Sequence, residues 1–181
     1  MIRSDAGLGP VLSAACAFFL MFSAVAMAGP ASQSVPKAEP AYRSYKKEIG
    51  CLARAIYFEA RGEPWSGQRA VAQVILNRVK SEYYPDTICD VVYQNDHLKN
   101  ACQFSFACDG IPDKIKEPEA FKRAELIARE SFQCNELWCE TDAPLARSTH
   151  YHADTVKPWW SKKLERTGQV GSHIFYYTAT M

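Results

Sequence analysis

Apolar residues recur at helical spacing near residue 50 and lead to an acidic residue. Ile49, Leu52 and Ile56 follow one another at steps of three and four, and the next position on that face is Glu59. Gly62 predicts a left-handed cap, with a proline two residues later, so we expect Glu59 in the last helical turn. Burial beside apolar side chains and the negative end of a helix both raise the pKa of a carboxyl group. Glu59 is therefore a candidate general acid, and a solvated surface glutamate is the alternative.

The same periodicity predicts two further helices. One is expected over residues 66–80 with Ser66 as its N-cap, and the other begins at Glu117-Pro118. Asn77 adjoins the apolar face of the first, where it either faces solvent, the favoured interpretation, or braces the site. The two apolar faces consist of Ala70, Val71, Val74, Ile75 and Val79, and of Phe121, Ala124, Ala128 and Phe132.

The pattern changes in the intervening and C-terminal segments. Residues 88–93 fit either a short helix or a strand, and residues 94–116 predict a long loop rich in Gly, Asp, Asn and Pro. Residues 149–153 and 173–178 are β-branched and aromatic runs, which predict a small antiparallel pair of strands. Helices followed by a small sheet indicate an α+β domain.

Residues 1–28 have the features of a signal peptide. An apolar stretch over residues 11–27 follows Arg3 and ends in an Ala-Met-Ala cleavage pattern. The stretch is short for a membrane span, so we expect cleavage and no stable membrane insertion afterwards. Export to the periplasm or cell envelope, or secretion, follows from this interpretation.

The remaining chain divides into a tether and one domain. Residues 29–45 are rich in Pro, Ala, Ser and Lys and predict a flexible linker, whereas residues 46–181 can bury a single core. The formal net charge of +1 argues against a nucleic-acid binder. We expect a monomer.

Seven cysteines are present, and six of them follow the predicted signal peptide. In an exported chain an even number of cysteines indicates disulfides, although sequence alone does not choose the pairs. Neither short spacing is the Cys-x2-Cys of zinc sites, and we expect no metal or cofactor. The favoured pairs are Cys51 with Cys89, Cys102 with Cys108 and Cys134 with Cys139.

Five sequence blocks occur in a recognisable order. They are AIYFEARGEP at 55–64, GQ-x-AVA at 67–72, VILNRV at 74–79, CQFS at 102–105 and G-x-HIF at 171–175. From about Cys51 to Tyr177 the chain resembles the SleB-like cell-wall hydrolases, the family of spore cortex-lytic enzymes. The resemblance implies a lysozyme-like α+β fold in which Glu59 acts on the glycan strands of peptidoglycan.

Cleavage of a glycosidic bond requires a proton donor and normally a second carboxylate about 5 to 9.5 Å away. No second carboxylate stands out, although Asp109, Asp154 and Glu63 are candidates. Without one, the C6 hydroxyl of muramic acid can attack its own C1 and form a 1,6-anhydro product. This is lytic transglycosylase chemistry, which the resemblance also permits, with Glu59 acting first as acid and then as base.

The expected function is cleavage between N-acetylmuramic acid and N-acetylglucosamine. Trp159 and Trp160 either stack on sugars or pack in the core, and a structural role is favoured for His173. Two alternatives stay open, a non-catalytic peptidoglycan-binding module and a zinc amidase that uses histidines 150, 152 or 173; the chain lacks an obvious His-Glu zinc motif. The expected substrate-binding residues are Glu63, Gln103, Ser105, Tyr151 and His152.

Overall fold

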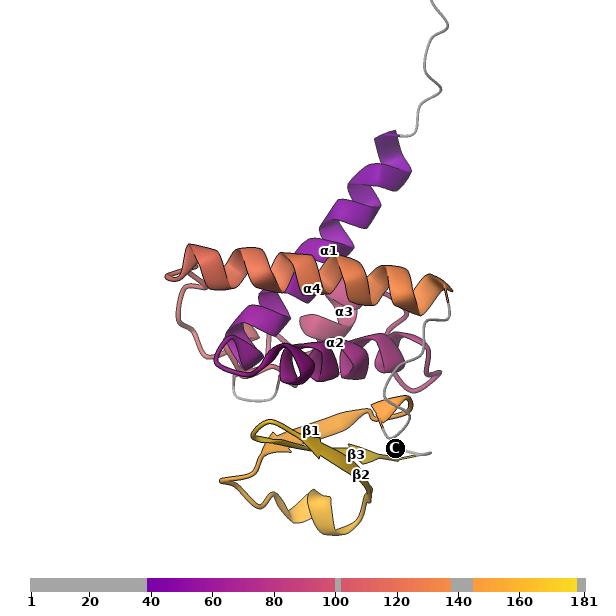
Figure 1. The fold of residues 1–181 in the computed structure, drawn as a ribbon, viewed down its shortest axis with the longest axis vertical. Helices are drawn as coiled ribbons and strands as arrows, with labels where there is room; N and C mark the ends of the chain where they lie inside the picture. Colours follow the sequence, from indigo (N-terminus) through magenta and orange to yellow (C-terminus); the bar gives the residue numbers. More distant parts are fainter. Residues whose placement is uncertain (1–38, 100–101, 138–144, 179–181) are drawn as a thin grey trace, which may run out of the picture. The chain divides into compact units, whose positions relative to one another are not determined.

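The structure is a computed structural model that describes residues 39–99, 102–137 and 145–178. The predicted signal peptide and most of the predicted linker lie outside these ranges. Four α-helices precede three strands along the described chain (Figure 1). The helices are α1 (Glu39–Ala60), α2 (Trp65–Val79), α3 (Ile88–Val92) and α4 (Pro118–Leu137), the strands are β1 (His150–Ala153), β2 (Glu165–Val170) and β3 (His173–Tyr177), and the single 3-10 turns are η1 (Ser105–Ala107) and η3 (Trp159–Lys162).

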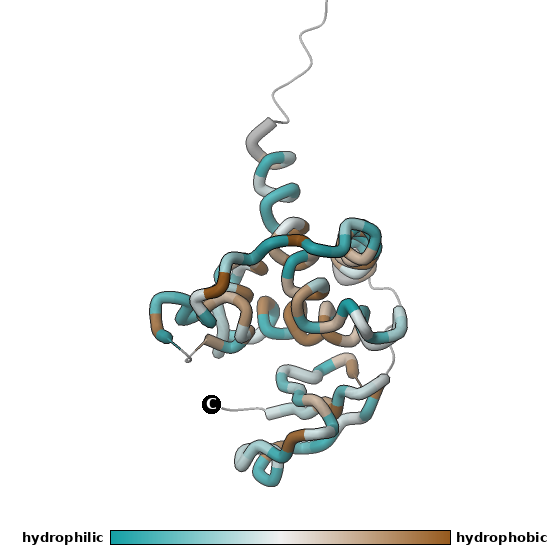
Figure 2. The backbone as a smooth tube through the Cα atoms, turned by 90° about the vertical axis from the view of Figure 1, so that its left-hand side faces the viewer, coloured by the Kyte–Doolittle hydropathy of each residue, from teal (hydrophilic) through white to brown (hydrophobic). Residues whose placement is uncertain are grey.

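Helix α1 is longer than the sequence pattern predicted. It begins at Glu39, so residues 39–45, expected in the flexible linker, are helical and that boundary was wrong. Residues 41–44 are exposed, and this end of α1 projects beyond the other helices (Figures 1 and 2). Tyr45 then packs edge-on against Phe132 of α4, with ring centroids 5.4 Å apart. The contact of α1 with α4 therefore begins at Tyr45, one turn before the apolar stripe that starts at Ile49.

The junction between α1 and α2 also differs from the prediction. Gly62 does not adopt a positive φ; instead the backbone N–H of Glu63 donates to the carbonyl of Ala60, 2.9 Å away. Helix α2 begins one residue earlier than expected, with Pro64 rather than Ser66 at the N-cap position and no side-chain capping bond. Proline fixes its own φ near the value that this position adopts, so the turn needs no glycine in the left-handed region.

The helices enclose the main hydrophobic core. Helix α2 contacts α1, α3 and α4, and it also contacts the sheet, so it lies between the other helices and the strands (Figure 1). The predicted start of α4 at Pro118 is confirmed, and of the two alternatives for residues 88–93 the helix is observed. The fully buried side chains of the core include Leu52, Ile56, Val71, Ile75, Leu76, Phe104 and Ile127.

Asn77 is buried rather than solvent-facing, so the favoured interpretation of this residue was wrong. Its side chain is 8% exposed, and Nδ2 donates to the carbonyls of Leu145 at 3.1 Å and Ser148 at 2.8 Å. Its Oδ1 accepts from Gln73 at 2.8 Å. A buried amide is stable here because its donors and acceptor all have partners. Asn77 thus braces the segment that leads into the sheet.

The sheet is antiparallel with strand order β1-β3-β2. The predicted pair is confirmed as β1 and β3, in a register that places Tyr151 opposite Phe175. Strand β2 was not predicted from the sequence pattern; it is an edge strand of mostly polar residues whose register shifts between Arg166 and Gly168. Because adjacent residues of a strand point to opposite faces, Tyr151 and His152 lie on opposite sides of the sheet.

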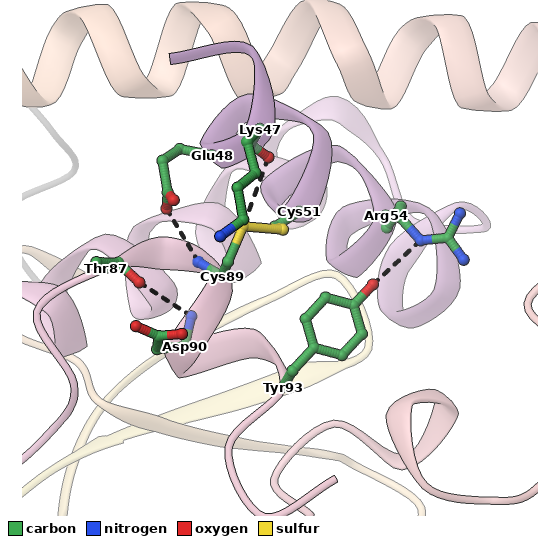
Figure 3. Close-up of a disulfide and its surroundings, with 8 residues drawn as sticks. All are labelled: Lys47, Glu48, Cys51, Arg54, Thr87, Cys89, Asp90 and Tyr93. Atoms are coloured by element: carbon green, nitrogen blue, oxygen red, sulfur yellow. Dashed lines mark hydrogen bonds between the residues drawn. A yellow bond between two sulfur atoms is a disulfide. The ribbon is translucent and has the colours of Figure 1, made fainter. Parts of the chain in front are cut away.

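Two of the three expected disulfides are observed. Cys51 of α1 bonds to Cys89 of α3 (Figure 3), and Cys102 bonds to Cys108 across η1. The pairing of Cys134 with Cys139 stays a prediction, because Cys139 lies outside the described residues. None of the described helices is both long enough and apolar enough to cross a bilayer.

Candidate functional site

Glu59 lies in the last turn of α1, as the glycine and proline that follow it predicted. Its carboxyl group receives two hydrogen bonds from distant parts of the chain. The phenol of Tyr151 on β1 donates to Oε2 at 3.2 Å, and the backbone N–H of Ser105 at the start of η1 also donates to the carboxyl. The fold therefore brings together three of the predicted site residues.

Burial raises the pKa of Glu59 above its ordinary value. The hydrogen bonds from Tyr151 and Ser105 favour the carboxylate and pull the pKa in the other direction, but burial is the larger effect. A carboxyl group in this balance holds a proton closer to neutral pH than a solvated glutamate, and its two donors remain to stabilise the anion once the proton has left. Such a group can act as a general acid and then as a base.

Tyr151 is a reliable donor because its own proton is held tightly. Burial and the nearby charge of Glu59 raise the pKa of the phenol well above its ordinary value. The ring packs edge-on against His173, with centroids 5.1 Å apart, and lies 5.8 Å from Phe175. These contacts on β3 limit the movement of the ring, so the hydroxyl stays directed at Glu59.

A short loop closed by the disulfide between Cys102 and Cys108 presents Ser105 to Glu59. Within it, Phe104 is fully buried and Phe106 is 7% exposed, with the Phe106 ring stacked on Phe58 at 4.8 Å. Gln103 and Ser105, which directly precede and follow Phe104, are exposed. The loop therefore combines fixed aromatic anchors with polar side chains that are open to a ligand.

Glu63 occupies a different environment from Glu59. Both its oxygens bind Ser172 in the turn between β2 and β3: Oε2 accepts the backbone N–H at 3.0 Å, and Oε1 accepts the hydroxyl. Partial burial alone would raise the pKa of Glu63, but these bonds and the charge of His173 bring it below the ordinary value. Glu63 thus holds the hairpin against the α1–α2 junction as a carboxylate.

The close approach of this hairpin depends on a glycine. Gly171 has a φ of +57°, and a Cβ built there would collide with Oε2 of Glu63. Arg61 and Arg69, the arginines nearest to Glu63 in the sequence, form ion pairs with Glu117 and Glu130 respectively.

His152 does not join the other predicted binding residues. Its side chain is 9% exposed, on the sheet face opposite to Tyr151. Nδ1 pairs with the carbonyl of Ala153 at 2.8 Å and Nε2 with the hydroxyl of Tyr176 at 3.0 Å. Since both nitrogens are engaged inside the protein, the structure gives His152 a structural role.

Trp159, Trp160 and His173 also differ in exposure and in the face of the sheet on which they lie. Trp160 packs against His150 and His152 on that outer face, with centroids 5.5 Å from each, whereas Trp159 is 72% exposed. His173 lies on the face of Tyr151, and its Nδ1 is buried without a hydrogen-bond partner among the described residues. Within residues 39–99, 102–137 and 145–178, no group of three His, Cys, Asp or Glu side chains is placed to hold a metal ion.

The other acidic candidates for a second carboxylate, Asp109 and Asp154, are not among the hydrogen-bond partners of the Glu59 carboxyl. Asp109 accepts the backbone N–H of Ile111 at 2.7 Å and lines an open hollow of about 690 Å³ to which Glu59 does not contribute. Asp154 follows β1, and its charge acts on His173. Among the described residues, no carboxylate affects the pKa of Glu59.

Sequence reasoning missed two residues that shape the site. Ser172 lies in a polar turn, and nothing in its neighbours indicates that it binds Glu63. Arg78 stands at the end of α2, where a cation usually faces solvent, yet it is fully buried. Its neighbour Asn77, on the rim of an apolar face, was the signal that this end of the helix carries buried polar contacts.

Comparison with known proteins agrees with this architecture. The family model described as Cell Wall Hydrolase matches residues 62–176, a range that contains Glu63 and begins three residues after Glu59. The spore cortex-lytic enzyme of Halalkalibacterium halodurans is 33% identical over 133 residues, which is 71% of this chain and 34% of the relative. That of Bacillus subtilis is 30% identical over 129 residues, covering 71% and 37% respectively. The chain thus spans about a third of the length of these two relatives.

Two solved structures share the fold. The catalytic domain of the germination-specific lytic transglycosylase SleB from Bacillus anthracis superposes with a TM-score of 0.54 at 29% identity, covering 72% of this chain and 94% of that domain. The SleB catalytic domain of Bacillus cereus gives 0.52 at 32% identity, covering 72% and 90%. The expected lysozyme-like α+β fold is therefore confirmed. With the family model matching more than half of its length, the chain belongs to the cell wall hydrolase family.

Proposed function

We propose that this protein cleaves the glycan strands of peptidoglycan between N-acetylmuramic acid and N-acetylglucosamine, as a lytic transglycosylase. The observation that carries the proposal is the pairing of a buried Glu59, whose pKa is raised by burial, with two donors, Tyr151 and Ser105. The relationship to spore cortex-lytic enzymes and to a solved lytic transglycosylase domain supports the same substrate class.

The mechanism follows from the protonation of Glu59. In its neutral form the carboxyl group gives a proton to the glycosidic oxygen as the bond to C1 of muramic acid breaks. The resulting carboxylate is stabilised by the Tyr151 hydroxyl and the Ser105 N–H. It then takes the proton of the C6 hydroxyl as that oxygen bonds to C1, which closes the 1,6-anhydro ring and returns Glu59 to its acid form.

This route needs only one carboxyl group. A hydrolase would need a second carboxylate within about 5 to 9.5 Å to activate water or to attack the sugar. No described carboxylate acts on the pKa of Glu59, and Glu63 is held by Ser172. An intramolecular hydroxyl as nucleophile therefore fits the site better than an activated water.

Substrate contacts are proposed for the exposed polar groups beside Glu59. Gln103 and the hydroxyl of Ser105 lie on the disulfide-closed loop and can bind sugar hydroxyl or acetamide groups. Glu63 shapes this edge of the site through Ser172. Because peptidoglycan lies in the cell envelope, the protein acts there, and residues 1–28 are proposed to direct its export.

Mass spectrometry of products from purified sacculi tests the proposal. The protein, isolated after export with its disulfides intact, should release muropeptides that carry 1,6-anhydro-muramic acid, one water lighter than the reducing sugar. Asp109→Asn and Asp154→Asn should retain substantial activity. Products that carry ordinary reducing ends, released by an enzyme that either Asn variant inactivates, would show that the protein is a hydrolase and not a transglycosylase.

Two further outcomes of the same experiment would overturn glycan cleavage itself. Free stem peptides released from intact glycan, with activity lost on chelation, would indicate a zinc amidase. Sacculi that bind the protein but release nothing would indicate a non-catalytic module.

A further inference from the structure

Arg78 is a buried cation that the proposed chemistry does not use. Its side chain has no exposed surface, and Nε donates to the carbonyl of Thr149 at 2.7 Å. The guanidinium lies over the rings of Tyr84 at 5.1 Å and Phe104 at 5.5 Å. Within the described residues, Nη1 and Nη2 are buried and have no hydrogen-bond partner. Burying a charge without a counter-ion is costly, so stability alone does not explain this arginine.

One set of contacts leads from Arg78 to Tyr151. The Thr149 carbonyl that Arg78 holds lies two residues before Tyr151, on the segment that enters β1. Asn77, the preceding residue of α2, fixes the Leu145 and Ser148 carbonyls of the same segment. The end of α2 therefore sets the position from which β1 presents its phenol.

A second set leads from Arg78 to Ser105. The Phe104 ring under the guanidinium belongs to the loop closed by the Cys102–Cys108 bridge. Phe104 is fully buried and directly precedes Ser105, whose backbone N–H donates to Glu59. The planar guanidinium of Arg78 thus packs against Phe104 and supports the loop at the residue that precedes Ser105.

We propose that Arg78 is a positioning residue for Glu59, because its planar guanidinium fixes from one buried point both groups that donate hydrogen bonds to the Glu59 carboxyl. The kinetic part of its test rests on the proposed function, because it requires that the protein cleaves glycan. Lysine cannot replace arginine in this role, since an ammonium offers neither a stacking plane nor the fixed direction of Nε.

Other titratable groups surround this arrangement and bear on the test. Burial and the charge of Glu59 raise the pKa of Tyr151, whereas the Arg78 charge acts in the opposite direction. Burial, and to a smaller extent Arg78, lowers the pKa of His150 to about 4. The other titratable groups are Tyr84, whose ring lies under Arg78, and His173, whose ring packs against Tyr151. The charges of Glu63, Asp154 and His152 act on His173.

The test compares Arg78→Lys and Arg78→Met with Ile127→Ala, a variant of a fully buried core residue on α4 that lowers stability and changes no hydrogen bond to Glu59. The pKa of Glu59 is measured by carboxyl carbon NMR titration, and kcat and KM are measured against pH on soluble glycan strands. Tyr151 and Ser105 both lower the pKa of Glu59, so loosening them should raise it by about one unit, the equivalent of a charge-assisted hydrogen bond. We expect the alkaline limb of kcat/KM to move up equally in both Arg78 variants. We also expect kcat to fall at least about tenfold with little change in KM.

Several results would overturn the inference. The first is a Glu59 pKa that stays at its wild-type value in folded Arg78 variants, whatever their stability. The second is an Arg78→Lys variant with the wild-type Glu59 pKa and kcat. A shift of equal size in Ile127→Ala would attribute the effect to general loosening of the core.

If neither Arg78 variant folds, Phe104→Leu is the second test, because it removes the ring under the guanidinium. It should raise the pKa of Glu59, and an unchanged pKa would refute the role of Arg78. Failure of the wild type to cleave glycan would refute the proposed function instead, and the NMR titration would still decide the role of Arg78.

Discussion

The phenol of Tyr151 donates to Oε2 of Glu59 across 3.2 Å, although the two residues are 92 positions apart in the chain. The bond joins the last turn of α1 to the strand β1. It is the contact by which the helical and sheet parts of the domain together form one acid–base group.

Replacing Glu59 by glutamine should remove activity and leave the fold intact. Glutamine has nearly the same shape and still accepts the hydrogen bond from Tyr151, but it cannot donate a proton as an acid. Loss of a general acid is worth about 10²- to 10⁴-fold in rate. Release of anhydro-muropeptides measures the loss, and circular dichroism checks the fold.

Glu63→Gln is the matched control for that experiment. Glutamine can still accept the Ser172 N–H through its oxygen and donate to the Ser172 hydroxyl through its nitrogen, but both bonds lose the negative charge of the carboxylate, so the hairpin loosens. We expect a lower melting temperature and a smaller loss of turnover than for Glu59→Gln. Equal or greater loss of turnover at Glu63 would exchange the roles of the two carboxylates.

Tyr151→Phe should raise the pKa of Glu59. The phenol favours the carboxylate, and a hydrogen bond to a charged group is worth about 1.5 to 3 kcal/mol, or roughly one to two pKa units. A general acid works only while it is protonated, so the alkaline limb of kcat/KM should move to higher pH while the maximum rate falls. A limb that moves to lower pH would contradict the assigned direction of this bond.

The two observed disulfides should differ in what they stabilise. Removing the Cys51–Cys89 bridge, which spans 38 residues, should lower the free energy of unfolding by about 4 kcal/mol in the chain-entropy model, and removing Cys102–Cys108, which spans 6, by about 2. Turnover should follow the reverse order, because the shorter bridge closes the loop that carries Ser105. Serine variants assayed by urea unfolding and by glycan cleavage measure both quantities.

His150 should make the protein less stable as pH falls from about 6.5 towards 4. Burial, together with the charge of Arg78, lowers its pKa from 6.5 to about 4, so between these values the unfolded chain binds a proton that the folded chain does not. Stability is therefore complete above pH 6.5 and declines below it. His150→Asn, which keeps an amide near the position of Nδ1, should show a smaller decline in urea unfolding between pH 7 and 5. An unchanged decline would assign the effect to other groups.

The main features of the fold could be predicted from the spacing of apolar residues. The stripe that ends at Glu59, the buried face of α2 and the β1–β3 pair are all local patterns, because buried faces repeat at helical or strand period. Strand β2 lacked such a pattern, since an edge strand needs little apolar surface. The sugar-binding role expected for both Tyr151 and His152 conflicts with the same alternation, which places adjacent strand residues on opposite faces.

The remaining site contacts could not be predicted from local patterns. Arg78 and Ser172 act through partners that lie 71 and 109 positions away, respectively, and neither residue is unusual in its own segment. The burial of Arg78 depends on two aromatic rings from separate loops. Such contacts appear only when the tertiary structure brings the segments together.

The turn between β2 and β3 also limits how this sequence can vary. Gly110 and Gly171 both have left-handed backbones, with φ of +75° and +57°, but nothing lies within 4 Å of a Cβ built at Gly110. Asparagine, which tolerates that conformation, can replace Gly110 at small cost. At Gly171 any side chain would also displace the carboxylate of Glu63 from Ser172. Substitutions at position 171 are therefore expected to occur together with substitutions at position 63, so that two positions 108 residues apart covary.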